Sequence, residues 1–180
     1  VLEDVLYSEG HTTRSYLQDL AQRFPSAERV ALVGRLPNFA KRAGVALQTP
    51  FVDGAMGTRF MIRDAALHMR TLSGYQGETG ITILGGAGRI GDQVCQDLLG
   101  AFSEVIAFDK RYVHEEIVVT ERGRLIRTSS TARLNEHRLF IGLTHHGDAI
   151  RELADFLPQG GMIADDTHPC ISPSVRAQLL

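Results

Sequence analysis

The sequence has no tryptophan and only two cysteines, Cys95 and Cys170. Two cysteines are too few for a disulfide framework, so we expect a protein of a reducing compartment, the cytoplasm. No apolar run is long enough to cross a bilayer, and no signal-peptide pattern is present. The chain also lacks a long basic block, and its formal net charge is −2. These absences argue against partners such as nucleic acid or a membrane surface.

The composition is otherwise that of an ordinary globular protein, with 43% hydrophobic and 22% charged residues. A length of 180 residues suits one compact domain or one and a half. The chain starts at Val1 and stops where a helical pattern begins after Ser172 and Pro173. We therefore expect it to be a piece of a longer protein.

The most informative stretch passes from a strand pattern into a glycine turn and then into a helical pattern. Its glycines fit G-x-G-x-x-G in the required setting, after a strand and at the start of a helix. We expect Gly86 to permit the tight turn, Gly88 to let backbone approach a pyrophosphate, and Gly91 to let helix and strand pack closely. The positive end of the helix dipole would also favour phosphates. The residues predicted to hold the cofactor here are Gly86, Ala87, Gly88, Arg89, Ile90 and Gly91.

The second half of this fingerprint is an acid at the end of the next strand pattern. Residues 104–109 end in Asp109, which lies about 20 residues after the glycines, where a carboxylate can bind the adenosine ribose. Asp109 therefore favours NAD as cofactor. Lys110 and Arg111 follow directly and could pair with a 2′-phosphate, so NADP stays open. The alternative interpretations are a turn-capping acid and a solvated basic pair.

Strand and helix patterns alternate along the chain. Helices are predicted at 14–24, 36–43, 59–72 and 148–156, and strands at 29–34, 45–47, 81–84, 104–109, 138–144 and 162–165. A β-hairpin at 116–128 replaces a crossover helix. The alternation predicts an α/β fold: a doubly wound, mostly parallel Rossmann-like sheet with a small N-terminal α/β lobe. We expect the lobe and connecting helix at 1–75 and the dinucleotide-binding domain at 76–180.

Ligands of such a sheet lie beyond the carboxyl ends of its strands. Thr144 follows a strand there and is predicted to contact the cofactor. His145 and His168 are candidate general acids or bases, because histidine titrates near neutrality. Cys170 is a candidate nucleophile if His168 or a helix N-terminus lowers its pKa. Surface histidines and a small apolar cysteine are the alternative interpretations.

Several of these polar residues are of metal-ligand types: His145, His146, Asp165, Asp166 and His168. Their spacing matches no ligand pattern, so no metal site is predicted. Asp165 and Asp166 are successive on an extended stretch and should point to opposite sides. Arg59 opens a helical pattern, where it would either meet an anionic substrate or be solvated.

The order of parts resembles two-domain NAD(P)-dependent oxidoreductases of the amino-acid and shikimate dehydrogenase-like group. The likeness rests on a small lobe, a glycine loop and helix from Gly57 to Leu72, the strand ending in Asp109, and the stretch Leu157–Asp165. A more distant likeness is to acyl-carrier-protein reductases. The chain departs from shikimate dehydrogenases in lacking their Lys–Asp pair in the N-terminal lobe. His145 and His146 also replace the small residues usual at that point.

The resemblance implies a cofactor and a reaction class. Our first hypothesis is an NAD(P)-dependent oxidoreductase, or its cofactor-binding part, which transfers a hydride to or from a small carbonyl, hydroxy or amino substrate in the cleft between lobes. A non-catalytic dinucleotide-binding module of a larger protein is the second. A methyltransferase using S-adenosylmethionine is the third, although the position of Gly91 inside the helix favours a dinucleotide. The expected partner is a small molecule, and a homodimer is left open.

Overall fold

The structure is a computed structural model, and it describes residues 10–34, 36–74 and 80–179. Contacts divide the chain into two units, 1–58 and 59–180, which are described separately below. The division falls within helix α4 (Ala55–Leu72), whereas the sequence pattern places the boundary after residue 75. Ile62, Ala66 and Met69 of α4 belong to the buried core of the second unit, which explains the earlier division.

The N-terminal unit contains α2 (Gly10–Arg23), β1 (Val30–Leu32), α3 (Leu36–Arg42) and β2 (Phe51–Asp53). The two strands are parallel, and Val30 pairs with Phe51. The strand predicted at 45–47 is wrong. The Val45 N–H donates to the Ala40 carbonyl at 2.8 Å, so this run closes the end of α3. The second strand lies instead at 51–53, in a stretch that the sequence pattern leaves irregular.

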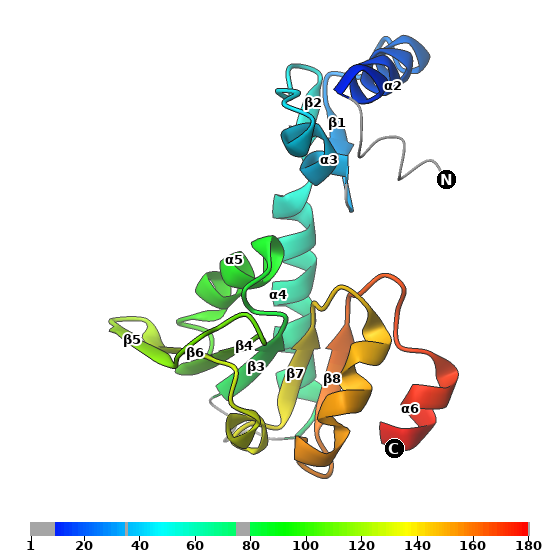
Figure 1. Ribbon diagram of the computed structural model, residues 1–180. Coiled ribbons are helices and arrows are strands. Elements are labelled where there is room, and N and C mark those ends of the chain that lie inside the picture. The colour runs from blue at the N-terminus through cyan, green and yellow to red at the C-terminus, as the bar shows by residue number, and fades with distance from the viewer. Residues whose placement is uncertain (1–9, 35, 75–79, 180) are drawn as a thin grey trace. The chain divides into compact units, whose positions relative to one another are not determined.

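The described part of the second unit holds a six-stranded sheet in the order β5-β6-β4-β3-β7-β8 (Figure 1). Neighbouring strands are parallel except at β5, which is antiparallel to β6. The predicted hairpin is therefore confirmed, and it takes the place of a crossover helix between β4 and β6. The strands are β3 (Gly80–Leu84), β4 (Glu104–Phe108), β5 (Glu116–Thr120), β6 (Gly123–Thr128), β7 (Leu139–Gly142) and β8 (Met162–Asp165).

Helices cover both faces of this sheet, as a doubly wound fold requires. Helices α4 and α5 (Arg89–Leu98) pack on one face, where Ile83, Val94 and Ile141 are buried together. The 3-10 helices η1 (Thr131–Asn135) and η2 (Gly147–Phe156) and helix α6 (Pro173–Leu179) pack on the other face with Phe140. Phe140 and Ile141 are successive on β7, so they point to opposite faces. The predicted fold class is confirmed: α/β, with a doubly wound, mostly parallel Rossmann-like sheet.

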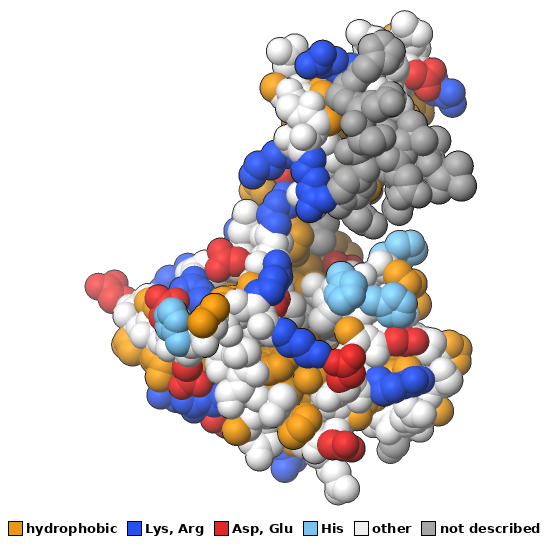
Figure 2. Space-filling model, in the orientation of Figure 1, with side chains coloured by type: hydrophobic (Ala, Val, Ile, Leu, Met, Phe, Trp, Pro, Cys, Tyr) orange, Lys and Arg blue, Asp and Glu red, His pale blue; other side chains and the backbone are white. Residues whose placement is uncertain are grey.

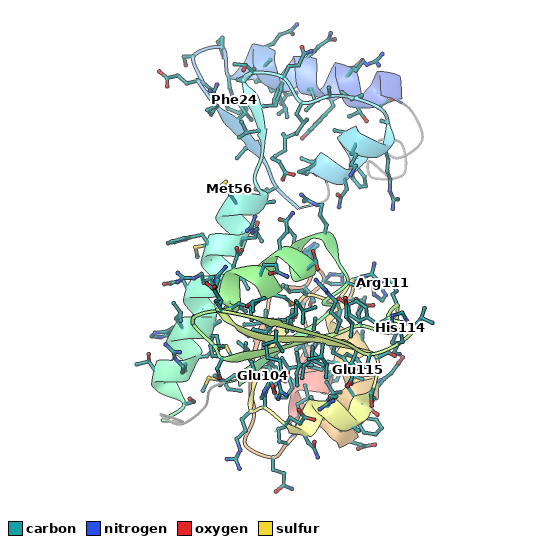
Figure 3. The ribbon with its side chains drawn as sticks, turned by 90° about the vertical axis from the view of Figure 1, so that its left-hand side faces the viewer. Phe24, Met56, Glu104, Arg111, His114 and Glu115 are labelled. Atoms are coloured by element: carbon teal, nitrogen blue, oxygen red, sulfur yellow. The ribbon has the colours of Figure 1, made fainter. Side chains whose placement is uncertain are left out.

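A partly buried polar network lies toward the amino ends of the strands, at the other end of β4 from Arg111 (Figure 3). The His137 ring is 3.2 Å from the Thr82 hydroxyl and 3.1 Å from a Glu104 oxygen, and Glu104 pairs with Arg124. Gly80 makes room for this ring, because a Cβ there would lie 2.0 Å from His137 Nε2. The network ties together residues of β3, β4 and β6 and the residue His137 before β7.

Across residues 10–34, 36–74 and 80–179, none of the helices combines the length and the apolar character needed to cross a bilayer.

Candidate functional site

The turn after β3 is built around Gly85 rather than Gly86. Gly85 has φ +93°, a left-handed conformation that favours glycine, and a Cβ there would lie 2.5 Å from the Leu143 carbonyl oxygen. The N–H groups of Gly85 and Gly86 both donate to the Phe108 carbonyl, at 2.9 and 3.0 Å. The tight turn predicted at Gly86 therefore falls one residue earlier, because Gly85 alone of the two takes positive φ.

The three motif glycines differ in the space around them. A Cβ on Gly86 would lie 2.7 Å from the Cβ of Ala107, and one on Gly91 would lie 2.3 Å from the Gly85 carbonyl oxygen. Gly91 thus lets helix and strand pack closely, as predicted. Gly88 is the N-cap of α5, and a Cβ there would meet its nearest atom, the Gly85 oxygen, at 3.1 Å. Gly88 is therefore the motif glycine with the most open surroundings.

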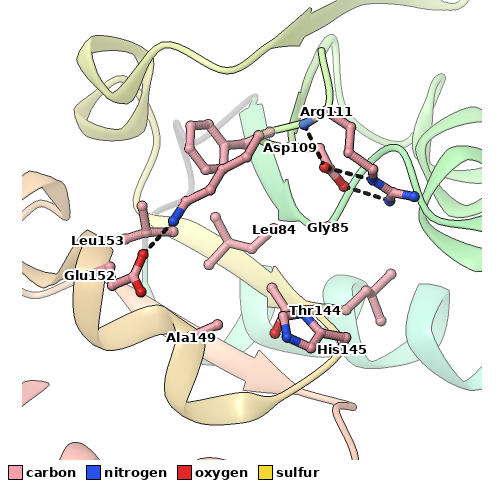
Figure 4. Close-up of a pocket in the computed structure, with 12 residues that line it drawn as sticks. Leu84, Gly85, Asp109, Arg111, Thr144, His145, Ala149, Glu152 and Leu153 are labelled. Atoms are coloured by element: carbon pink, nitrogen blue, oxygen red, sulfur yellow. Dashed lines mark hydrogen bonds and ion pairs between the residues drawn. The ribbon is translucent and has the colours of Figure 1, made fainter.

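A pocket of about 490 Å³ lies at the carboxyl ends of β3, β4 and β7 (Figure 4). The chain order reverses between β3 and β7, which is the switch point where doubly wound sheets bind their ligands. The volume is in the range of small-molecule sites. Its lining residues are Leu84, Gly85, Phe108, Asp109, Lys110, Arg111, Leu143, Thr144, His145, Ala149, Glu152 and Leu153.

Asp109 lies at the edge of this pocket and is almost fully buried. Its Oδ1 accepts from the backbone N–H and Nε of Arg111, each at 3.0 Å. Its Oδ2 accepts from the Ala87 N–H at 3.1 Å and from Arg111 Nη2 at 2.8 Å. Burial raises the pKa of Asp109, but the hydrogen bonds from Arg111 and Ala87 outweigh burial and hold it below its usual value.

Lys110 and Glu152 form an ion pair within the pocket lining (Figure 4). Lys110 follows β4 and Glu152 lies on η2, so the pair joins two elements of the pocket. Lys110 lowers the pKa of Glu152 through this hydrogen bond. Both side chains are exposed, so the pair contributes little to stability. Glu152 and the apolar Ala149 and Leu153 are site residues that the sequence did not reveal, because no motif marks them.

The loop after β7 carries two adjacent histidines, His145 and His146, in different surroundings. Thr144 and His145 line the pocket, and the Thr144 hydroxyl donates to the His146 carbonyl at 2.7 Å. His146 Nδ1 accepts from the Asp148 N–H at 3.1 Å, so His146 caps the start of η2. Of this pair, His145 is the residue that lines the pocket.

His168 and Cys170 lie on the loop after β8, which runs beside the loop after β7. The Gly147 N–H donates to the Pro169 carbonyl at 2.9 Å, and a Cβ on Gly147 would lie 2.2 Å from the backbone of Ile171. Figure 2 shows histidine side chains close together where these loops meet. His168 and Cys170 are both exposed and are not among the residues that line the pocket.

The two aspartates that precede this loop have different surroundings. Asp165 holds the loop in place: Oδ1 accepts from the Thr167 N–H and hydroxyl, and Oδ2 accepts from the Ile171 N–H at 2.8 Å. Burial, and then the charge of Asp165, raise the pKa of Asp166. Across the residues with described positions, no group of three or more His, Cys, Asp or Glu side chains is arranged to hold a metal ion.

Arg59 and Cys95 make contacts within the second unit. Arg59 binds both carboxylate oxygens of Asp97 on α5, at 2.6 and 2.5 Å, and so ties α4 to α5. The solvated position considered for Arg59 is therefore wrong, because its side chain is only partly exposed and is paired with Asp97. A contact of Arg59 with an anionic substrate stays a prediction. Cys95 is buried in α5, and burial raises the pKa of its thiol. It packs among core residues of the second unit.

Comparisons of the chain with protein-family models, with curated proteins and with solved structures find no match in any of the three.

Proposed function

We propose that the second unit binds a nicotinamide dinucleotide and works as an NAD(P)-dependent oxidoreductase, or as the cofactor-binding part of one. The observation that carries this proposal is the pocket at the switch point, directly beside the glycine turn. Both parts of the fingerprint meet there, since Ala87 of the turn donates to Asp109 at the end of β4.

The placement of residues assigns each part of the cofactor a set of partners. The phosphates would lie against Gly88 at the start of α5, where the helix dipole favours negative charge. Adenosine would occupy the end of the pocket beside Asp109, and nicotinamide would lie toward Thr144 and His145. The bound cofactor would supply the hydride chemistry, and the protein its orientation and surroundings.

Proton transfer would fall to His145, which is the histidine among the described residues of the pocket lining. His168 and Cys170 lie on the adjoining loop and stay candidates for the substrate side. The substrate would be a small carbonyl, hydroxy or amino compound. As part of the same proposal, we place the protein in the cytoplasm, where Cys95 and Cys170 would remain thiols.

A non-catalytic dinucleotide-binding module is the second candidate function. The observation in its favour is that charged side chains of the pocket are already engaged: Asp109 with Arg111, and Lys110 with Glu152. A methyltransferase is the third, because S-adenosylmethionine also binds at a glycine turn. Turnover with a panel of aldehydes, ketones, hydroxy acids and amino acids separates an enzyme from a module.

The first test is calorimetric titration with NADH, NADPH and S-adenosylmethionine in parallel. Calorimetry is preferred because the chain contains no tryptophan whose fluorescence a ligand could quench. Binding of either nicotinamide dinucleotide, with no heat from S-adenosylmethionine, supports the proposal. Binding of S-adenosylmethionine alone would replace it with the methyltransferase, and no binding of any of the three would refute it.

Gly88→Val is expected to weaken dinucleotide binding by about tenfold or more, because its side chain would stand where the pyrophosphate approaches backbone. The matched control is Gly57→Val in α4, where a Cβ would have no atom within 4 Å. The control should bind as the unaltered protein does in the same titration. Unchanged binding by Gly88→Val would show that the phosphates do not lie at this turn.

A further inference from the structure

Asp109 occupies the position from which an acid recognises the ribose of NAD, but its acceptor sites are filled. A carboxylate offers about four lone-pair sites. Arg111 fills three of them with its backbone N–H, Nε and Nη2, and the Ala87 N–H fills another. A ribose diol must donate both of its O–H groups to the acid. It could do so here only by displacing charge-assisted hydrogen bonds from Arg111.

The guanidinium of Arg111 lies beside both Asp109 and the glycine turn. Its Nη2 lies 3.8 Å from the position that a Cβ on Gly88 would take. The side chain is 65% exposed. In the part of the chain that the structure describes, its Nη1 makes no hydrogen bond, so that side of the planar fork is open to solvent. A guanidinium with open donors is well suited to bind a phosphate through parallel hydrogen bonds.

From these contacts we infer that the adenosine end of the pocket recognises the 2′-phosphate of NADP(H) rather than the free ribose diol of NAD(H). The inference rests on the proposed function and names the cofactor of that same site. Arg111 is the main ligand of the phosphate, and Asp109 holds Arg111 in place instead of binding ribose. The cofactor preference that Asp109 indicates in the sequence is thereby reversed, since the carboxylate is the anchor of a cation.

Lys110 can add a second positive charge, and Glu152 opposes it. The described charges of the lining balance in pairs, Asp109 with Arg111 and Lys110 with Glu152. Both side chains of the pair between Lys110 and Glu152 are exposed, so breaking this ion pair costs little free energy. A phosphate, which carries nearly two negative charges, competes well with one carboxylate for Lys110.

The test compares NADPH with NADH by calorimetry in the unaltered protein and in Arg111→Ala. The unaltered protein should bind NADPH about tenfold to a hundredfold more tightly than NADH. This ratio corresponds to the net free energy of one hydrogen bond between charged groups. In Arg111→Ala that preference should vanish, because NADPH loses affinity while NADH keeps or gains it. The fragments adenosine 2′,5′-bisphosphate and adenosine 5′-monophosphate should show the same contrast. Arg176→Ala, an exposed arginine on α6, is the matched control and should keep the preference.

The alternative ligand of Arg111 is the pyrophosphate, which NADH and NADPH share. If Arg111 contacted only the pyrophosphate, Arg111→Ala would weaken NADH and NADPH equally, and the inference would be overturned. Preference for NADH in the unaltered protein would overturn it too, while leaving the proposed function intact. Absence of binding by either cofactor would instead refute the proposed function.

A second variant keeps the inference testable if Arg111→Ala folds poorly. Glu152→Gln removes the carboxylate that competes for Lys110, and it leaves Arg111 and Asp109 untouched. NADPH should bind this variant several-fold more tightly, and NADH should bind it as before. An equal effect on both cofactors, or none, would contradict recognition of the 2′-phosphate here.

Discussion

Replacing Gly91 with alanine is expected to lower the free energy of unfolding by about 3 kcal/mol. The added Cβ would lie 2.3 Å from the Gly85 carbonyl oxygen and 3.1 Å from the Gly86 Cα. Both are backbone atoms of the turn, which cannot move away freely because Gly85 already approaches Leu143 and donates to Phe108. Accommodating the methyl group would therefore shift α5 along β3.

Equilibrium unfolding in urea measures this loss, and Gly88→Ala is the matched control. A Cβ on Gly88 meets its nearest atom at 3.1 Å, so the control should lose less than about 1 kcal/mol. The sign of the Gly91 effect is diagnostic, since alanine inside a helix is otherwise favoured over glycine by about 1 kcal/mol. An unchanged or increased stability of Gly91→Ala would mean that α5 and β3 do not pack as closely as described.

The central sheet could be predicted because its strands have local signals. The runs at 81–84 and 138–144 are mostly apolar, as fully buried strands are, and the structure has β3 and β7 there. The hairpin followed from two such runs flanking Gly123, which has φ +138°. Asp109 could be placed beside the glycine turn because parallel strands end at the same edge of a sheet.

The remaining features depend on partners far along the chain. The strand at 51–53 is short and mostly exposed, so only its pairing with β1 identifies it. Arg59 finds Asp97 on another helix, and no local pattern distinguishes it from a solvated arginine. The sequence does not show which glycine of the turn takes positive φ, and in the structure it is Gly85. The atoms that leave no room for side chains at Gly85 and Gly86 belong to Leu143 and Ala107, which lie far along the chain. These features arise from contacts between elements that are distant in the sequence, so no local sequence pattern reveals them.

Asp109→Asn is expected to lower the free energy of unfolding by about 2 kcal/mol at pH 7, a figure reduced from that of a buried ion pair because Arg111 is exposed. The amide can accept with one oxygen only, and its NH₂ group would face donors of Arg111 or Ala87. Asp155→Asn, an exposed aspartate on η2, is the matched control and should change stability by less than about 0.5 kcal/mol.

The same variant has a distinct dependence on pH. Because the folded-state pKa of Asp109 lies below its usual value, its stabilisation is complete above the unfolded-state pKa of about 4 and is lost as pH falls through the folded-state pKa. The stability difference between the unaltered protein and Asp109→Asn should therefore be constant from pH 7 to about 5 and shrink below about 4. Urea unfolding at each pH measures it. A difference that stays constant into the acid range would show that Asp109 does not stabilise the turn as a charged group, and Arg111 would then lack its anchor.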